Sequence, residues 1–109
     1  MNLLRIEAAL RTSEGRFDDA ARLWQQVAER EPGASSTYVS LGTALGKAGQ
    51  HALAIDAFER ALQLSSEADV HGHLADAYRA LGRDQDAARA RAVYEELREQ
   101  RLRARGAGR

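Results

Sequence analysis

Two carboxylates and an imidazole lie together on one side of a predicted helix in the second half of the chain. Asp69, His73 and Asp76 are spaced at i, i+4 and i+7, which places them on one helix face. Such side chains bind divalent metals. A closed site needs about four ligands, however, and no second helix offers an obvious fourth. We therefore predict no metal and no cofactor, and interpret the trio as a histidine whose charge two acids balance.

The same trio is the only arrangement in the sequence that resembles acid–base catalysis. It has no accompanying nucleophile, and the chain has no glycine-rich phosphate-binding loop. Of the other histidines, His71 is expected to be a half-buried packing residue and His51 a polar helix start. We predict no catalytic residue and expect that the protein is not an enzyme.

Composition limits the classes of partner. The 109 residues include 16 basic and 16 acidic side chains and no cysteine. A chain of this length forms one domain at most. Its balanced charge argues against an electrostatic field of one sign over the whole protein, which would attract nucleic acid or a membrane surface. No apolar run is long enough to span a bilayer, and the N-terminus lacks the pattern of a signal peptide. We expect a cytoplasmic protein, with an Ala-, Arg- and Gly-rich composition that suggests a bacterial source.

The C-terminal stretch is locally basic. Residues 89–109 contain seven arginines and three glutamates, a net charge of +4. A nucleic-acid surface would gather the arginines on one face beside aromatic stacking partners. Here Arg101, Arg103 and Arg105 alternate around the helix and no aromatic residue follows Tyr94. We interpret the stretch as a solvated helix face whose cations suit a helix C-terminus, and expect neither nucleic acid nor membrane as a partner.

The elements that must position these side chains are all helical. Apolar residues recur with helical spacing, and Gly15, Gly49 and Gly82 interrupt the pattern at turns. Ser66 lies three residues before Asp69, a spacing typical of a capping box. The predicted helices cover residues 3–12, 17–30, 36–48, 51–64, 67–80 and 84–105.

The stretch from Tyr38 to Leu64 is the most regular part of the chain. Gly42 and Ala54 have small side chains at positions where a large one would keep the two helices apart. The two helix backbones can therefore approach closely, with Phe58 beside them. This hairpin has an apolar face on each side and cannot bury both alone. It must have neighbours.

The flanking hairpins repeat this pattern. Ala20, Ala54 and Ala87 correspond at intervals of 34 and 33 residues. Ile6 and Leu41 also correspond, and because they lie 35 residues apart, one extra residue is expected in the first loop at Ser13-Glu14. The pattern of aromatic, Leu-Gly, Ala, Phe and Ala residues at this period resembles the tetratricopeptide repeat. The resemblance implies a right-handed all-α solenoid of three helix-turn-helix repeats, at about residues 2–34, 35–67 and 68–100. A single domain would cover 1–105, with an extended last helix and a disordered tail at 106–109.

Two positions depart from the repeat. In the alignment above, Glu7 stands where Gly42 and Ala75 stand, so its carboxylate must reach water at the open N-terminal end. Arg91 stands where Trp24 and Phe58 stand. We interpret Arg91 as part of the polar outer face that a terminal repeat requires.

The resemblance also implies a function, because the family binds extended peptides or helices in a groove lined by the first helix of each repeat. We therefore predict a non-enzymatic scaffold for another protein. Leu4 and Ala8 fall at groove positions of the first repeat in our alignment. The remaining groove candidates are Ser36, Val39, Ser40, Thr43, Lys47, Asp69, His73, Asp76 and Arg79.

Two alternatives stay open. The N-terminal helix is too apolar for a free edge, which indicates homo-oligomerisation through Leu3, Leu4, Ile6 and Leu10. In the second alternative, the chain is the adaptor part of a larger enzyme whose catalytic domain is absent from this sequence. The oligomeric state tests the first alternative, and the full gene length tests the second.

Overall fold

The structure, a computed structural model, describes residues 3–107 of the chain. Within that range every regular element is a helix, as predicted. The helices are α1 (Leu3–Ser13), α2 (Phe17–Arg30), α3 (Ser35–Lys47), α4 (His51–Leu64), α5 (Ala68–Ala80) and α6 (Asp84–Ala107).

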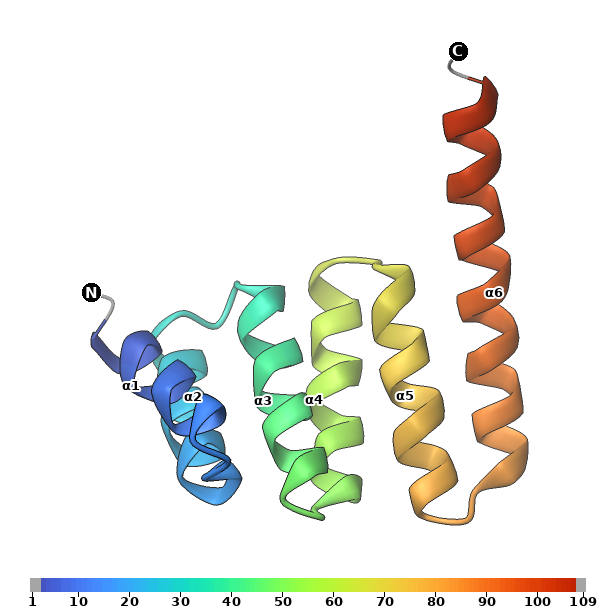
Figure 1. The fold of residues 1–109 in the computed structure, drawn as a ribbon. Coiled ribbons are helices and arrows are strands. Elements are labelled where there is room, and N and C mark those ends of the chain that lie inside the picture. Colours follow the sequence, from blue (N-terminus) through green and yellow to red (C-terminus); the bar gives the residue numbers. More distant parts are fainter. Residues whose placement is uncertain (1–2, 108–109) are drawn as a thin grey trace.

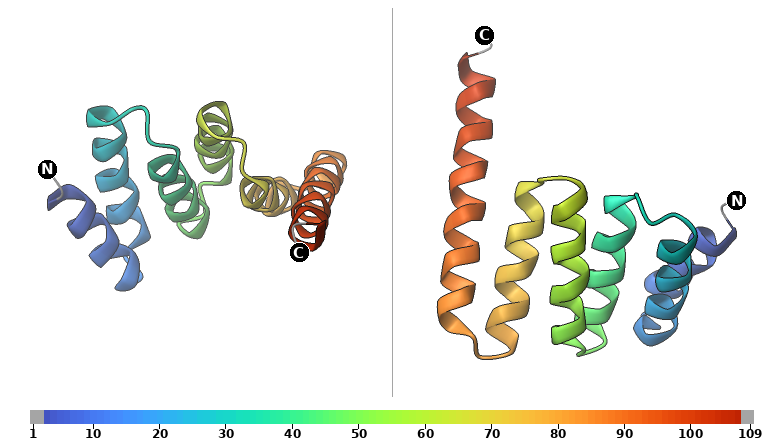
Figure 2. Two further views of the ribbon diagram at one scale, coloured as in Figure 1. Left: turned by 90° about the horizontal axis from the view of Figure 1, so that it is seen from above. Right: turned by 180° about the vertical axis from the view of Figure 1, so that it is seen from behind.

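The helices form three antiparallel hairpins stacked side by side (Figure 1). Contacts run mainly between consecutive helices, and α3 also contacts α5, the first helix of the next hairpin. Seen from above, α1, α3 and α5 occupy one row and α2 and α4 the other (Figure 2). The predicted all-α solenoid is confirmed, and it places the first helices of the hairpins along one shared surface.

Local details correct several predicted boundaries. Helix α3 begins at Ser35 rather than residue 36, and α5 begins at Ala68. The predicted capping box at Ser66 is wrong, because no side chain caps α5 and Glu67 occupies the N-cap. Helix α6 continues to Ala107 and projects well past α5 (Figure 1). The predicted disordered tail is therefore wrong for residues 106–107, and 108–109 lie outside the described residues.

The core consists largely of alanine. One cluster joins the second and third hairpins around Phe58, and another joins the first and second around Leu41. Small side chains let helix backbones approach closely, so the aromatic rings fill the remaining space. The Phe58 ring lies directly over Gly42, where a Cβ atom would come within 2.6 Å of its Cε1 atom.

The buried alanines also correct the repeat alignment. Ala8, Gly42 and Ala75 are the buried small residues of the three first helices, and they lie 34 and 33 residues apart. Glu7 is exposed beside this position and does not occupy it, so the predicted departure at Glu7 is wrong. The predicted extra residue in the first turn is also wrong. The irregularity lies between the hairpins, where residues 31–34 form a four-residue connection and residues 65–67 one of three.

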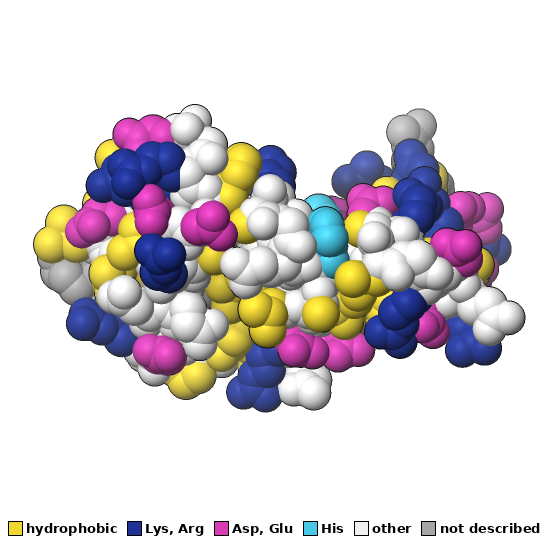
Figure 3. Space-filling view, turned by 90° about the horizontal axis from the view of Figure 1, so that it is seen from below, with side chains coloured by type: hydrophobic (Ala, Val, Ile, Leu, Met, Phe, Trp, Pro, Cys, Tyr) yellow, Lys and Arg dark blue, Asp and Glu magenta, His cyan; other side chains and the backbone are white. Residues whose placement is uncertain are grey.

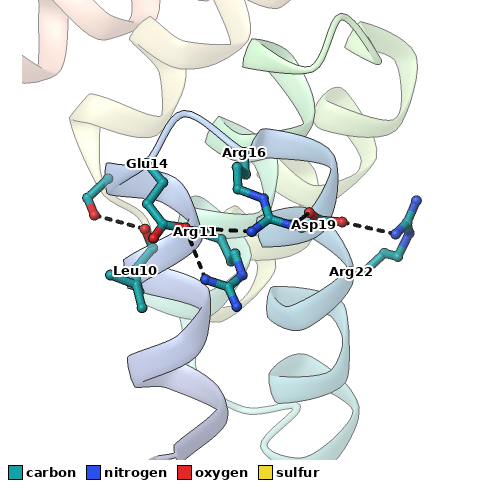
Figure 4. Close-up of polar contacts among 7 residues, drawn as sticks. Leu10, Arg11, Glu14, Arg16, Asp19 and Arg22 are labelled. Atoms are coloured by element: carbon teal, nitrogen blue, oxygen red, sulfur yellow. Dashed lines mark hydrogen bonds and ion pairs between the residues drawn. The ribbon is translucent and has the colours of Figure 1, made fainter.

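The first turn carries a chain of alternating charges (Figure 4). Glu14 lies 3.0 Å from Arg11 and 3.9 Å from Arg16, and Arg16 lies 2.8 Å from Asp19. Asp19 also pairs with Arg22 at 3.1 Å. Such exposed pairs each contribute about 0–1 kcal/mol. Their main consequence is local neutralisation: acidic and basic side chains are interspersed over the end of the molecule viewed from below (Figure 3).

Among the residues that the structure describes, Thr37 is the one buried polar side chain in the core. Its side chain is fully buried, and its Oγ1 atom has no hydrogen-bond partner. A buried hydroxyl without a partner costs about 1–3 kcal/mol. The corresponding residue of the third hairpin is Val70, which is buried without a polar atom.

We therefore expect Thr37→Val to raise the free energy of unfolding by about 1 kcal/mol. The substitution keeps the β-branched shape and removes the unsatisfied oxygen. Urea unfolding followed by circular dichroism measures the change. As a control, Thr43→Val removes a hydroxyl that donates to the Val39 carbonyl at 2.8 Å at a half-buried position, and it should not stabilise the fold. Equal effects from both substitutions would contradict the explanation.

Candidate functional site

The predicted groove residues lie on the two first helices α3 and α5. Ser36 is exposed near the start of α3, and Val39 and Ser40 are half-buried further along it. Val39 packs against the core cluster around Phe58. Four of the predicted residues instead line one shared hollow, and these are Thr43, Lys47, His73 and Asp76.

This hollow, of about 200 Å³, lies between the second and third hairpins. We name it the inter-repeat hollow. Sequence reasoning missed six of the residues that line it, which are Gly42, Gly46, His51, Ala54, Phe58 and Ala77. The pair of glycines one helical turn apart was the signal for them.

The hollow exists because α3 presents no side chain at two successive turns. Gly42 leaves room for the Phe58 ring. At Gly46 the nearest atom to an added Cβ would be the Ala54 Cβ at 3.9 Å, so space remains open above it. The imidazole of His73 stacks on Phe58 with ring centroids 5.3 Å apart and planes inclined by 12°. The floor is therefore apolar and aromatic.

Polar groups surround this apolar floor. Lys47 is exposed, and its ammonium lies 5.3 Å from the centroid of the Phe17 ring. On the opposite side Asp76 pairs with Arg79 at 3.4 Å. The arrangement offers an apolar recess between a cation and an acid.

The Asp69, His73 and Asp76 trio lines a second hollow together with Gly72, Arg91 and Tyr94. Over residues 3–107, no three His, Asp or Glu side chains are grouped closely enough to hold a metal ion. Asp76 is engaged by Arg79, and Arg91 approaches from α6. The trio is therefore part of a charged surface and not a ligand set.

His71 faces away from these hollows. It lines a different surface, with Leu74 and Tyr78 of α5 and Val93 of α6. Partial burial lowers the pKa of its imidazole, because removal from water disfavours the charged form. This position corresponds to Tyr38, and the predicted packing role agrees with the half-buried side chain.

The N-terminal helix presents the other predicted surface. Leu3, Ile6 and Leu10 are exposed, whereas Leu4 is half-buried. Ala8 is fully buried, so it does not line a groove as the sequence alignment implied.

At the far end, the outer side of α6 carries mainly charged residues, with Tyr94 and the exposed Leu102 among them. Arg91 lies 3.9 Å from Glu95, and its guanidinium lies 5.7 Å from the centroid of the Tyr94 ring. None of the described helices has the length and apolar character that crossing a bilayer requires.

Comparisons with known proteins agree with this architecture. The sequence profile of a family described as Tetratricopeptide repeat matches residues 7–69 and 39–100. No protein with a curated description matches in sequence.

Several solved structures resemble this fold closely. The structure described as MamA MSR-1 C2 is 30% identical, with 89% of this chain and 56% of that chain covered and a TM-score of 0.85. MamA AMB-1 P212121 is 31% identical, with coverage of 88% and 53% and a TM-score of 0.83. The Yersinia enterocolitica type III secretion translocator chaperone SycD, 22% identical over 86% and 66%, has a TM-score of 0.81 and shares the fold alone. The chain thus spans about half the length of these MamA structures.

Proposed function

Since this chain belongs to the tetratricopeptide repeat family, we propose that it is a non-enzymatic interaction module that binds a peptide or helix of another protein on its α3–α5 surface. The inter-repeat hollow is the observation that carries the proposal. It is a recess on the row of first helices, it has an apolar floor, and polar groups surround it. Peptide sites generally combine these features, with pockets giving specificity for individual side chains.

The size of the hollow limits what enters it. An engineered cavity of about 150 Å³ holds one benzene molecule, so a hollow of about 200 Å³ suits one large apolar side chain. Phe58 and Ala54 would contact that side chain, and the aromatic floor favours a phenylalanine, leucine or methionine anchor.

The surrounding charges suggest how the rest of the partner segment lies. An acidic group beside the anchor would meet Lys47, and a basic group on the other side would meet Asp76. Complementary charges of this kind fix orientation more than they add affinity. The proposed partner is therefore a segment with one apolar anchor between residues of opposite charge.

The substitution Gly46→Leu tests this proposal, because it should fill the hollow from within. A Cβ at this position makes only ordinary contact, and leucine favours a helix more than glycine does by roughly 0.7–1 kcal/mol. The fold should therefore remain intact. Burial of one anchor side chain contributes about 1.5–3 kcal/mol, so binding should weaken roughly 10- to 150-fold.

The measurement uses peptides selected from a random library displayed on phage, with the wild-type chain as bait and fluorescence anisotropy as the readout. Ala52→Leu adds the same side chain at an exposed position of α4 and serves as the matched control. Peptides with an apolar anchor should bind wild type and Ala52→Leu alike and lose affinity for Gly46→Leu. Failure to enrich any peptide, or equal binding to all three proteins, would overturn the proposal.

A further inference from the structure

The second half of α6 projects beyond the stack of hairpins. Helix α6 has 24 residues and α5 has 13, so α6 is the longer by about 16 Å. Leu97 is the last half-buried residue of α6, and residues 98–106 are all exposed. This projecting segment has no neighbouring helix among the described residues (Figure 1). Its side chains are therefore available to a partner.

Three arginines continue the packing face of α6 into the projecting segment. In the first half of α6, Ala87 and Ala90 are buried and Tyr94 is half-buried beside α5. Eleven residues make about three helical turns, so the same side of the helix is repeated at Arg98, Arg101 and Arg105. We call these three residues the α6 arginine row. The row extends the side of α6 that packs against α5.

The charges of the row are not balanced within the helix. Arg101 has no acidic residue three or four positions away in either direction, and two of its neighbours at these positions are Arg98 and Arg105. Like charges at such spacings destabilise a helix. Among the residues that the structure describes, no carboxylate pairs with the row, whereas Arg103 on another side pairs with Glu99 at 3.3 Å. A local departure of this kind is typical of a functional site.

A helix that carries carboxylates is the occupant that fits the row. The three cations recur at intervals of three and four residues, so carboxylates at the same intervals on a second helix would lie opposite them. Guanidinium groups bind carboxylates through paired hydrogen bonds. A second copy of α6 does not fit, because two arginine rows would repel each other. Its Glu95 and Glu99 are already paired, with Arg91 and Arg103.

Phosphate surfaces fit the projecting segment less well than an acidic helix does. Glu96 and Glu99 lie on the other side of the segment and would repel a nucleic acid or an anionic membrane. No aromatic residue follows Tyr94 to stack against bases. Leu97 and Leu102 lie on different sides of the row and do not form the apolar face with which a helix enters a membrane surface.

We propose that the α6 arginine row binds an acidic helix of another protein, one that presents carboxylates at intervals of three and four residues. This helix lies alongside the projecting segment, on the side where α5 lies beside the first half of α6. Exposed charge pairs are individually weak, so an isolated helix should bind with a dissociation constant of roughly 0.1 mM or above. The proposal does not depend on the inter-repeat hollow.

An NMR titration of the full chain tests the proposal, because chemical shifts report weak binding residue by residue. The probe is an alanine-based helical peptide of about 20 residues, with glutamates at intervals of three and four residues on one face. The matched peptide has glutamine at those positions. The wild type should bind the glutamate peptide with shifts concentrated at residues 97–106, and the glutamine peptide at least tenfold more weakly. Added salt should weaken the binding, because exposed charges are screened.

Two triple variants separate the row from the overall charge of the protein. The row variant combines Arg98→Gln, Arg101→Gln and Arg105→Gln. It should bind the glutamate peptide at least tenfold more weakly than wild type. The control variant removes the same charge at exposed arginines outside the row, by Arg22→Gln, Arg30→Gln and Arg89→Gln. It should bind like wild type. Circular dichroism verifies that both variants keep the helical signal of wild type, as expected for exposed positions.

Three results would overturn the proposal. The first is the absence of any shift in wild type with up to about 5 mM glutamate peptide. The second is an equal loss of binding in the row variant and the control variant, which would indicate a response to net charge alone. The third is tighter binding of a double-stranded DNA fragment, or of vesicles that contain phosphatidylserine, than of the glutamate peptide. That result would assign the row to phosphate groups.

Discussion

Phe58→Ala will lower the free energy of unfolding by about 3–5 kcal/mol. The ring is 3% exposed and belongs to the cluster that joins the second and third hairpins. Its removal takes away apolar burial and leaves a cavity over Gly42, because the rigid helix backbones cannot collapse fully into the space. Small domains are stable by only about 5–15 kcal/mol, so the variant should lie near the limit of folding.

The loss is measured by urea unfolding with circular dichroism and tryptophan fluorescence as separate probes. Trp24 reports the first hairpin and the helical signal reports the whole chain. Leu53→Ala, at a 51% exposed leucine on the same helix, is the control and should change stability by less than about 1 kcal/mol. A loss below about 1.5 kcal/mol for Phe58→Ala would contradict the packing described for this ring.

Gly42→Ala will destabilise the fold by about 1–3 kcal/mol, although alanine is the better helix former by roughly 1 kcal/mol. The added Cβ would lie 2.6 Å from Cε1 and 2.8 Å from Cδ1 of Phe58. The ring cannot move away freely because His73 stacks against it. Ala8 and Ala75 occupy the same repeat position in the other two hairpins, where Trp24 and Arg91 stand in place of phenylalanine.

Gly46→Ala, one turn later on the same helix, is the matched control. Its Cβ would meet nothing closer than the Ala54 Cβ at 3.9 Å, so it should stabilise the fold by up to about 1 kcal/mol. In the Phe58→Ala background, Gly42→Ala should lose its cost because the obstructing ring is gone. Urea unfolding of the four proteins in this cycle gives the coupling energy. Additive effects would show that the ring and the glycine are not in the close contact described.

The sequence alone predicted the helices, their order and their period well. The reason is that apolar spacing and turn glycines act locally: Gly15, Gly49 and Gly82 all adopt positive φ angles of 75° to 85° at the three turns inside the hairpins. The family resemblance then supplied the stacking of the hairpins.

The errors arose where apolarity does not indicate the direction of burial. Ile6 was aligned with Leu41 because both are large and apolar, yet Ile6 faces outward and Ala8 is the buried residue. An outward apolar row and an inward one have the same period, so only packing distinguishes them. Ser66 failed as a cap because a neighbouring residue, Glu67, took the N-cap position.

The sequence predicts only some of the residues of the candidate site, for a related reason. Thr43, Lys47, His73 and Asp76 have polar side chains on the right helix faces, so spacing places them near one another. The hollow itself depends on side chains that are absent, at Gly42 and Gly46, and on where the Phe58 ring comes to rest. A recess is a property of three helices together and has no periodic signal in any one of them.

The inter-repeat hollow belongs to no single hairpin: α3 and α4 supply one side of it and α5 supplies the other. In a stack held by nearest-neighbour contacts, an end hairpin can detach while the others stay folded. Detachment of α5 and α6 would therefore remove the proposed binding surface while the first two hairpins stay folded. Conversely, a bound partner stabilises the third hairpin in its packed position. At a free partner concentration one hundred times the dissociation constant, this stabilisation is about 2.7 kcal/mol. Detachment of the third hairpin and binding of the partner are then linked equilibria.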